Sequence, residues 1–339
     1  MHENWYSFLL KQSAVIEEGV VTGFADDTAT NDASADNYLC DLSQLDVLRI
    51  SGGDATEFLH GQFTSDITAL AQDHYQLSSW CNIKGRVIAV FILYRASDCY
   101  YLLLEREMTE QVSKRLGMFV LRSDVKIELV SDELVRLGLG GDETQRQFQQ
   151  QLQESGDNEP GVVLNLQEQP ARSLVLCTAA RAETLWLALS RGASAVSSAR
   201  WLEQDIRAGL PWPGKQGSEE FLPQSLNLDL LEGLSYSKGC YPGQEIISRM
   251  HFRGKLKQRM QLARVGADTL PQSGTHVYTQ DSDKQCGSVV RACETAEKQY
   301  LMLLTLDIFE AATPGIFLGD KQGPGIELLD LPYPLSAGK

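Results

Sequence analysis

The chain has 339 residues, enough for two or three domains with a sizeable core, and its 43% hydrophobic and 22% charged residues are ordinary for a globular protein. Its formal net charge of −15 repels nucleic-acid phosphates, so direct binding of RNA would need a local basic surface and is not expected. The longest apolar run, 87–94, is too short to cross a bilayer, and the N-terminus lacks the pattern of a signal peptide. We therefore expect a soluble, cytoplasmic protein without membrane contact.

The first predicted elements follow a polar N-terminal region, 1–38. Its second half, from residue 20 onward, is rich in Asp, Ala, Thr and Asn, which predicts a mobile connection. Alternating residues then predict a strand at 45–51 that ends at a pair of glycines. Asp54 suits the N-cap of a following helix, with Glu57 at the capping-box position.

Short strands joined by tight turns characterise the next stretch. Strands are predicted at 74–80, 87–94, 100–105 and 125–130, with a turn at 83–86 and a helix at 110–119. Because neighbouring strands are joined by short turns, the pattern favours an antiparallel α+β fold over a doubly wound α/β fold.

The second half of the chain contains two further groups of elements. A Gln-rich helix at 142–155, strands at 162–166 and 173–177, and a helix at 182–190 predict a smaller α+β unit. From residue 258 onward, short strands alternate with Gly- and Pro-containing turns, as in a small β-barrel or sandwich. We expect four parts: the N-terminal segment and linker 1–38, an α+β domain made of 39–130 and 195–250, a second α+β unit 131–194, and a C-terminal β-barrel domain 251–339.

The cysteines and histidines do not form a metal-binding pattern. There is no CxxC pair, and the five histidines show neither HxxxH nor HExxH spacing. The pattern argues against a disulfide framework, a metal site and an iron–sulfur cluster held by four ligands of this chain alone, and it favours reduced thiols. The seven cysteines are Cys40, Cys81, Cys99, Cys177, Cys240, Cys286 and Cys293.

The most informative motif is Lys-Gly-Cys-Tyr-Pro-Gly-Gln-Glu at 238–245. Pro242 followed by Gly243 favours a type II turn, after which Gln244 opens a helix or a strand. If it is a helix, the positive end of its dipole and Lys238 would favour a thiolate at Cys240. The alternative is a structural turn that carries a small buried thiol.

A group of basic residues follows this motif. Arg249, His251, Arg253, Lys255, Lys257 and Arg259 occupy every second position. On a strand they would share one face, which could hold carboxylates or phosphates or serve as a docking surface, whereas the alternative is a solvated edge strand. Gly254 would interrupt that face with a bulge or a turn.

Trp201 is a candidate for binding an aromatic ligand. A helix predicted at 199–208 would place Trp201 one turn from Asp205, on the same face. Its ring could offer a flat platform to a heterocycle or simply fill the core.

The motif at 238–245 resembles the KGC[FY]xGQE signature of the YgfZ family, whose members are folate-binding relatives of the glycine-cleavage T-protein, an aminomethyltransferase. The resemblance extends over about residues 40–335. It also includes the segments 61–66, 84–86, 201–202, 209–211, 221–224 and 286–289.

This resemblance implies a three-part, ring-like architecture of T-protein-like folate-binding α+β domains and a C-terminal β-barrel. It implies a site for tetrahydrofolate, with or without a polyglutamate tail, and a role in the assembly or repair of iron–sulfur proteins. The implied partners are iron–sulfur enzymes, among them the tRNA methylthiotransferases, through which the protein would act indirectly on tRNA modification.

The resemblance also assigns roles to particular residues. It places the functional thiol at Cys240, with Lys238 beside it. Of two tryptophans associated with folate in relatives, one corresponds to Trp201 and the other falls near Leu45, where this chain has no aromatic residue. Further candidates for folate contact are Tyr241, together with Arg249 and Arg253 for the glutamate tail.

Three functions remain open at this point. The leading hypothesis is a tetrahydrofolate-binding accessory protein for iron–sulfur enzymes. The alternatives are a folate-dependent aminomethyl or methyl transferase of the T-protein type, and a binding module that senses folate.

Overall fold

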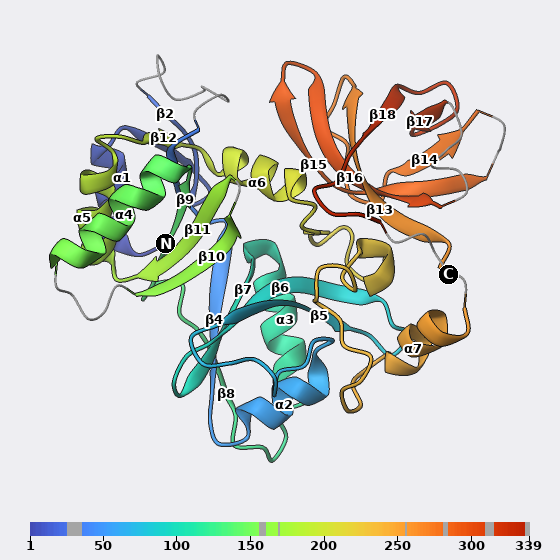
Figure 1. Ribbon diagram of the computed structural model, residues 1–339, viewed down its shortest axis with the longest axis horizontal. Coiled ribbons are helices and arrows are strands. Elements are labelled where there is room, and N and C mark those ends of the chain that lie inside the picture. Colours follow the sequence, from blue (N-terminus) through green and yellow to red (C-terminus); the bar gives the residue numbers. More distant parts are fainter. Residues whose placement is uncertain are drawn as a thin grey trace. The chain divides into compact units, whose positions relative to one another are not determined.

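The computed structural model describes residues 1–25, 36–155, 161–168, 170–254, 256–280, 284–308 and 315–335 (Figure 1). The chain divides into two compact units, each built from separate stretches of sequence: Met1–Arg49 with Glu128–Leu202, and Ile50–Ile127 with Glu203–Lys339. The expected segments 1–38 and 131–194 thus fall in the first unit, and the expected barrel segment falls in the second. The predicted α+β class with a C-terminal barrel is confirmed.

The first unit is a five-stranded sheet covered by helices. Its strand order is β10-β11-β9-β3-β12, and only the pairing of β12 with β3 is parallel among the described pairs. The strands are β3 (Tyr38–Asp41), β9 (Val135–Gly140), β10 (Val162–Glu168), β11 (Ala171–Cys177) and β12 (Ser194–Val196). The helices are α1 (Glu3–Lys11), α4 (Asp142–Ser155) and α5 (Ala179–Leu189), and a hairpin is formed by β1 (Ala14–Glu17) and β2 (Val20–Phe24).

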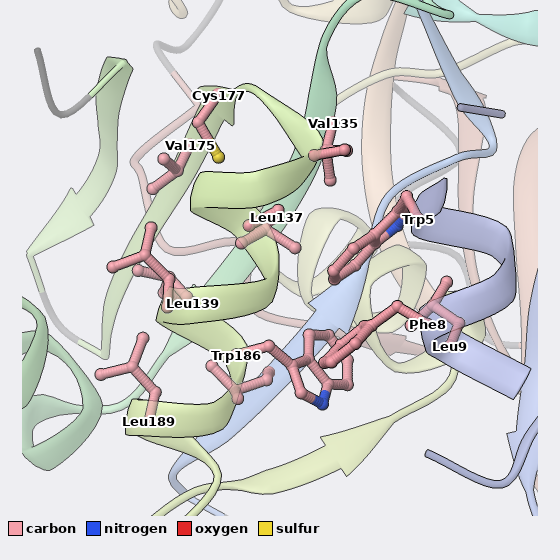
Figure 2. Packing of buried hydrophobic residues seen from close by; sticks show 14 of the residues in the cluster. Trp5, Phe8, Leu9, Val135, Leu137, Leu139, Val175, Cys177, Trp186 and Leu189 are labelled. Atoms are coloured by element: carbon pink, nitrogen blue, oxygen red, sulfur yellow. The ribbon is translucent and has the colours of Figure 1, made fainter. Parts of the chain in front are cut away.

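The N-terminal residues belong to the core of this unit. Trp5 of α1 stacks on Phe8 at 5.2 Å and meets the edge of Trp186 in α5 at 5.6 Å, between ring centroids (Figure 2). The indole N–H of Trp5 donates to Asp41 Oδ1 at 2.7 Å, so the polar end of this buried ring is satisfied. The polar connection predicted from residue 20 begins later than expected, because 20–24 form β2; its residues 26–35 lie outside the described ranges.

Helix α6 (Ser198–Arg207) carries Trp201, whose side chain is only 2% exposed. The indole lies against the backbone of β9 at Gly138, where a Cβ atom would lie 2.5 Å from two ring carbons. The guanidinium of Arg172 lies over the ring, 4.1 Å from its centroid. Gly138 is therefore required by the close approach of the indole to the strand.

The second unit begins with a sheet of order β5-β6-β7-β4-β8, in which β4 and β8 cross the boundary between the units. Its strands are β4 (Leu45–Ser51), β5 (Tyr75–Cys81), β6 (Val87–Arg95), β7 (Cys99–Glu105) and β8 (Lys126–Leu129), with helices α2 (Ala55–Gln62) and α3 (Arg106–Gly117). The predicted strands are present to within two residues. Asp54 lies at the N-cap of α2 as predicted, but its carboxylate accepts from the backbone N–H of Asp124 at 2.7 Å and makes no capping bond to the helix.

The rest of the second unit includes a closed barrel of order β13-β16-β15-β14-β17-β18. Its strands are β13 (Gln258–Gly266), β14 (His276–Thr279), β15 (Gln285–Ala296), β16 (Gln299–Asp307), β17 (Ile316–Leu318) and β18 (Gly325–Leu329). Alternate residues of β16, Met302, Leu304 and Leu306, are fully buried in the barrel core. Throughout the part of the chain that the structure describes, no helix has the length and apolar character needed to cross a membrane.

The contact between Gly138 and Trp201 generates a stability prediction. We expect Gly138→Ala to lower the free energy of unfolding by about 1–3 kcal/mol, because the new methyl group overlaps the buried indole. The matched control is Gly23→Ala in β2, where a Cβ meets no atom within 4 Å, and it should stay within about 0.5 kcal/mol of wild type. Urea unfolding followed by tryptophan fluorescence measures both, and equal stabilities would contradict the packing argument.

Candidate functional site

The motif 238–245 forms a tight turn that leads into helix α7 (Gln244–Phe252). Gly243 has φ 81° and ψ −3°, and the N–H of Gln244 donates to the carbonyl of Tyr241 at 3.2 Å. These are the features of a type II turn with Pro242 and Gly243 at its centre. The predicted turn is confirmed, and the element after it is a helix and not a strand.

Two glycines join this turn to the Lys84-Gly85-Arg86 turn between β5 and β6. A Cβ on Gly243 would lie 2.5 Å from the carbonyl oxygen of Asn82 and 2.6 Å from the Cα of Gly85. Gly85 also has a positive φ, 71°, so a side chain there would be strained. The two motifs therefore approach each other as closely as only glycine permits.

Lys238 anchors the start of the motif. Its ammonium donates to the carbonyl oxygens of His60, of Phe63 at 2.6 Å and of Ser65 at 2.9 Å. These carbonyls lie at the C-terminal end of α2 and in the loop that follows, where a cation is favoured. Burial lowers the pKa of Lys238 to about 8, against the opposing effect of Asp66, so the ammonium form still predominates at pH 7.

Further hydrogen bonds fix the backbone on both sides of Cys240. Before it, the N–H of Ser235 donates to the carbonyl of Thr64 at 2.9 Å, and the hydroxyl of Thr64 donates to the carbonyl of Gly233 at 2.7 Å. After it, the side-chain amide of Gln244 donates to the carbonyls of Lys238 and Gly239, both at 3.2 Å. The cysteine is thus presented from a loop held at both ends.

Cys240 is exposed, whereas the other six cysteines are buried. All seven cysteines lie in the described ranges. Burial raises the pKa of Cys81 to about 12, and it has the same effect on Cys177 and Cys293. Cys240 is the thiol that can reach another molecule without unfolding.

His60 lies close to the glycine that precedes Cys240. Its Nε2 is 3.7 Å from where a Cβ on Gly239 would be. Burial, and secondarily the charge of Lys238, lower the pKa of His60, while Asp66 opposes them. The lowered pKa favours the neutral form of the imidazole. Within the described ranges, no three His, Cys, Asp or Glu side chains are grouped as metal ligands would be.

Some of the predicted site residues lie together in one loop of the second unit, and others belong to the first unit. Lys238, Cys240 and Tyr241 lie within four residues of one loop, with the Lys238 ammonium 5.0 Å from the centroid of the Tyr241 ring. Tyr241 is 6% exposed, and burial raises the pKa of its hydroxyl. Leu45 and Trp201, also buried, belong to the first unit.

The basic residues after the motif do not share one face of a strand, so that prediction was wrong. The helix α7 continues to Phe252, Arg253 is its C-cap, and β13 begins only at Gln258. Arg249 and Arg253 are exposed, while Arg259 is buried and forms two hydrogen bonds with Asp229, at 2.6 and 2.9 Å. Lys255 lies outside the described ranges.

The helical spacing of the apolar residues in this segment was the missed signal. Ile246 and Ile247 meet the Gly85 turn, and Met250 lies one turn further along α7. The partners of Lys238 were missed for another reason: backbone carbonyls have no signature in the sequence. Likewise, nothing marked Asn82, whose side-chain oxygen accepts from the N–H groups of Lys84 and Arg86 at 2.9 and 3.0 Å.

Comparisons with known proteins match this chain over most of its length. A family model described as the GCVT N-terminal domain matches residues 8–191. The chain is 29% identical over 295 residues to the tRNA-modifying protein YgfZ of Escherichia coli O139:H28 (strain E24377A / ETEC). The aligned region covers 84% of this chain and 90% of the relative. The protein of the same name from Escherichia coli O9:H4 (strain HS) gives the same values. The resemblance to YgfZ expected from the sequence is confirmed.

Among solved structures, the glycine cleavage system aminomethyltransferase T from Bartonella henselae matches with a TM-score of 0.73. The match covers 98% of this chain and 97% of the other, at 15% identity, and it confirms the T-protein-like fold.

The Lys238 anchor generates the prediction of this subsection. Lys238→Met should lower the free energy of unfolding of the second unit by about 3–5 kcal/mol, because it leaves three carbonyls of a buried loop without their charged donor. The matched control is Lys84→Met, at an exposed lysine, with an expected change within about 0.5 kcal/mol. Thermal and urea unfolding measure both variants; a Lys238→Met protein as stable as the control would show that the anchor is not structural.

Proposed function

The chain belongs to the GCVT N-terminal domain family, and on that basis we propose that it is a tetrahydrofolate-binding accessory protein for iron–sulfur enzymes. In this role it assists the assembly or repair of their clusters, with Cys240 as its working thiol. It affects tRNA modification through client enzymes such as the tRNA methylthiotransferases.

The observation that carries this proposal is the exposed, backbone-fixed thiol of Cys240. Six cysteines are buried, whereas the seventh stands on a loop anchored by Lys238 and closed by Gln244. A rigid loop presents its sulfur in one position, which reduces the ordering cost of contact with another molecule. A sulfur in this setting suits a bond to an iron or sulfur centre outside the chain.

An accessory role agrees with the burial of the other cysteines, which could otherwise serve as ligands of an iron–sulfur cluster. Iron–sulfur clusters are commonly held by four cysteine thiolates. Here the other cysteines are buried, and the described residues contain no cluster of three potential metal ligands. We therefore assign Cys240 to contact with a cluster that belongs mainly to a partner protein.

An indirect effect on tRNA agrees with the charge of the chain. The relatives in Escherichia coli are named tRNA-modifying proteins. A net charge of −15 opposes the approach of a tRNA, whose phosphates extend beyond any local basic surface. A partner enzyme that binds the tRNA itself removes this conflict.

Tetrahydrofolate is proposed as the ligand because of the family relationship, and Trp201 is the residue of this chain proposed to contact its pterin. The indole is packed beneath Arg172 and is 2% exposed. A pterin that stacked on this ring would have to take the place of the guanidinium, exchanging one cation–π contact for an aromatic stack. Folate, when bound, supplies a one-carbon carrier.

Replacing the thiol tests the accessory role. Cys240→Ala should fold with wild-type stability, because its side chain is exposed, yet fail to restore methylthiolated tRNA in a strain that lacks the gene. Cys99→Ala, at a buried cysteine, is the matched control and should restore it. Nucleoside analysis by mass spectrometry gives the readout, and native thiol titration should lose its reactive group only in Cys240→Ala. Full restoration by Cys240→Ala would remove the thiol from the proposal.

Titration with tetrahydrofolate tests the ligand. Trp201→Phe should weaken binding about fivefold, because the smaller ring of phenylalanine stacks less well on a pterin. Trp186→Phe is the control, because it changes a buried tryptophan of the same unit that we do not assign to folate. Calorimetry measures the dissociation constants. If both variants bind as wild type does, the pterin lies elsewhere.

A further inference from the structure

A group of exposed basic and apolar residues lies at the two ends of helix α7. We call it the docking surface: Ile83, Lys84, Arg249, Phe252, Arg253 and Lys257, all of them exposed. Ile83 is 83% and Phe252 is 69% exposed, which is high for large apolar side chains. The Ile83–Lys84 turn meets the start of α7 through Gly85, and the other residues lie at or beyond the end of the helix.

Phe252 is held in this exposed position by an aromatic cluster. The rings of His251 and Tyr236 stack with centroids 3.8 Å apart and planes 18° apart. Phe252 meets both rings edge-on, at 4.7 Å from His251 and 6.2 Å from Tyr236. Arg249 precedes Phe252 by three residues, about one helical turn, and Arg253, the C-cap of α7, follows it directly.

A cavity of about 500 Å³ opens beside this end of the helix. Met250, Leu256, Phe221 and Leu222 form the apolar part of its lining, and the other lining residues are polar or charged, among them the cations Arg86 and Lys257. Glu220 and Asp307 also line it, so two carboxylates balance the two cations in the lining. It is large enough to receive a bulky apolar side chain, and the excess positive charge lies on the surface around it.

We propose that the docking surface binds an acidic segment of a partner protein, with one large apolar side chain of that segment in the cavity. Carboxylates of the partner would pair with Arg249, Arg253 and Lys84, while its apolar groups cover Phe252 and Ile83. This inference rests on the proposed function for the identity of the partner as an iron–sulfur enzyme. The motif that begins α7 also carries Cys240, so a partner bound along the helix comes next to the thiol.

A protein fits this surface better than a nucleic acid does. Basic and apolar side chains are both exposed here, and the cavity has both polar and apolar lining residues, which suits a segment that has both kinds of side chain. A tRNA would extend past the few cations onto a chain of net charge −15. The carboxylates of Glu220 and Asp307 at the cavity also oppose a phosphate there.

Fluorescence anisotropy on the full-length protein tests this proposal. The first probe is a labelled synthetic peptide rich in Asp and Glu with one Leu–Phe pair, and the second is the same peptide with Ser in place of that pair. The first should bind and the second should bind about tenfold more weakly, because it cannot fill the cavity. The double variant R249E/R253E should weaken binding of the first peptide at least about tenfold, and Phe252→Ser should weaken the first peptide more than the second.

The matched control is the double variant K11E/R191E, which makes the same change in net charge at exposed residues of the first unit and should leave peptide binding unchanged. No binding of the first peptide, or equal weakening by the control, would contradict the proposal, as would binding of a tRNA transcript without binding of the peptide.

Polyglutamylated tetrahydrofolate is titrated into R249E/R253E as well. Weaker folate binding with unchanged peptide binding would assign the arginines to the glutamate tail instead. Because none of these measurements uses Cys240, failure here is distinguishable from failure of the accessory role.

Discussion

The ammonium of Lys238, held by three backbone carbonyls, is the interaction on which the candidate site depends. It joins the segment before Cys240 to the end of α2, which is 173 to 178 residues away in the sequence. A buried lysine costs free energy unless its hydrogen bonds are made, and three carbonyl acceptors make them here. Once this anchor is in place, the turn at Gly243 and the amide of Gln244 complete the loop that exposes the thiol.

Glycines set how closely the neighbouring elements approach. Gly243 and Gly85 allow two turns to touch, and Gly138 allows the Trp201 indole to lie on the backbone of its sheet. At Gly243 and at Gly138 a single methyl group would overlap with backbone or with a buried ring, and at Gly85 the positive φ disfavours a side chain. The motif in the second unit and the tryptophan packing in the first unit therefore both require positions that have no room for a side chain.

The motif and the docking surface share one helix, and they offer different chemistry. The start of α7 is joined to the turn that carries the thiol, whereas its end has the exposed residues Arg249, Phe252 and Arg253. A fixed position of the Cys240 sulfur requires hydrogen bonds that hold the backbone of its loop. Recognition of a partner requires exposed charge and apolar area, which cost little in the isolated protein. The proposed partner would bind at the end of the helix, where it need not disturb the position of Cys240.

The sequence by itself determined the α+β class, the type II turn at Pro242–Gly243, seven of the strands to within two residues and the resemblance to YgfZ. These features depend on local pattern and on side chains with a signature, whereas strands such as β3, β9 and β12 were not predicted. It did not determine which cysteine is exposed, that 249–252 continue a helix, or that Arg259 pairs with Asp229. Those features were decided by the tertiary structure. Burial, the approach of two glycines and the capture of Lys238 by carbonyls all depend on contacts between residues far apart in the chain, and a backbone carbonyl is the same chemical group at every position.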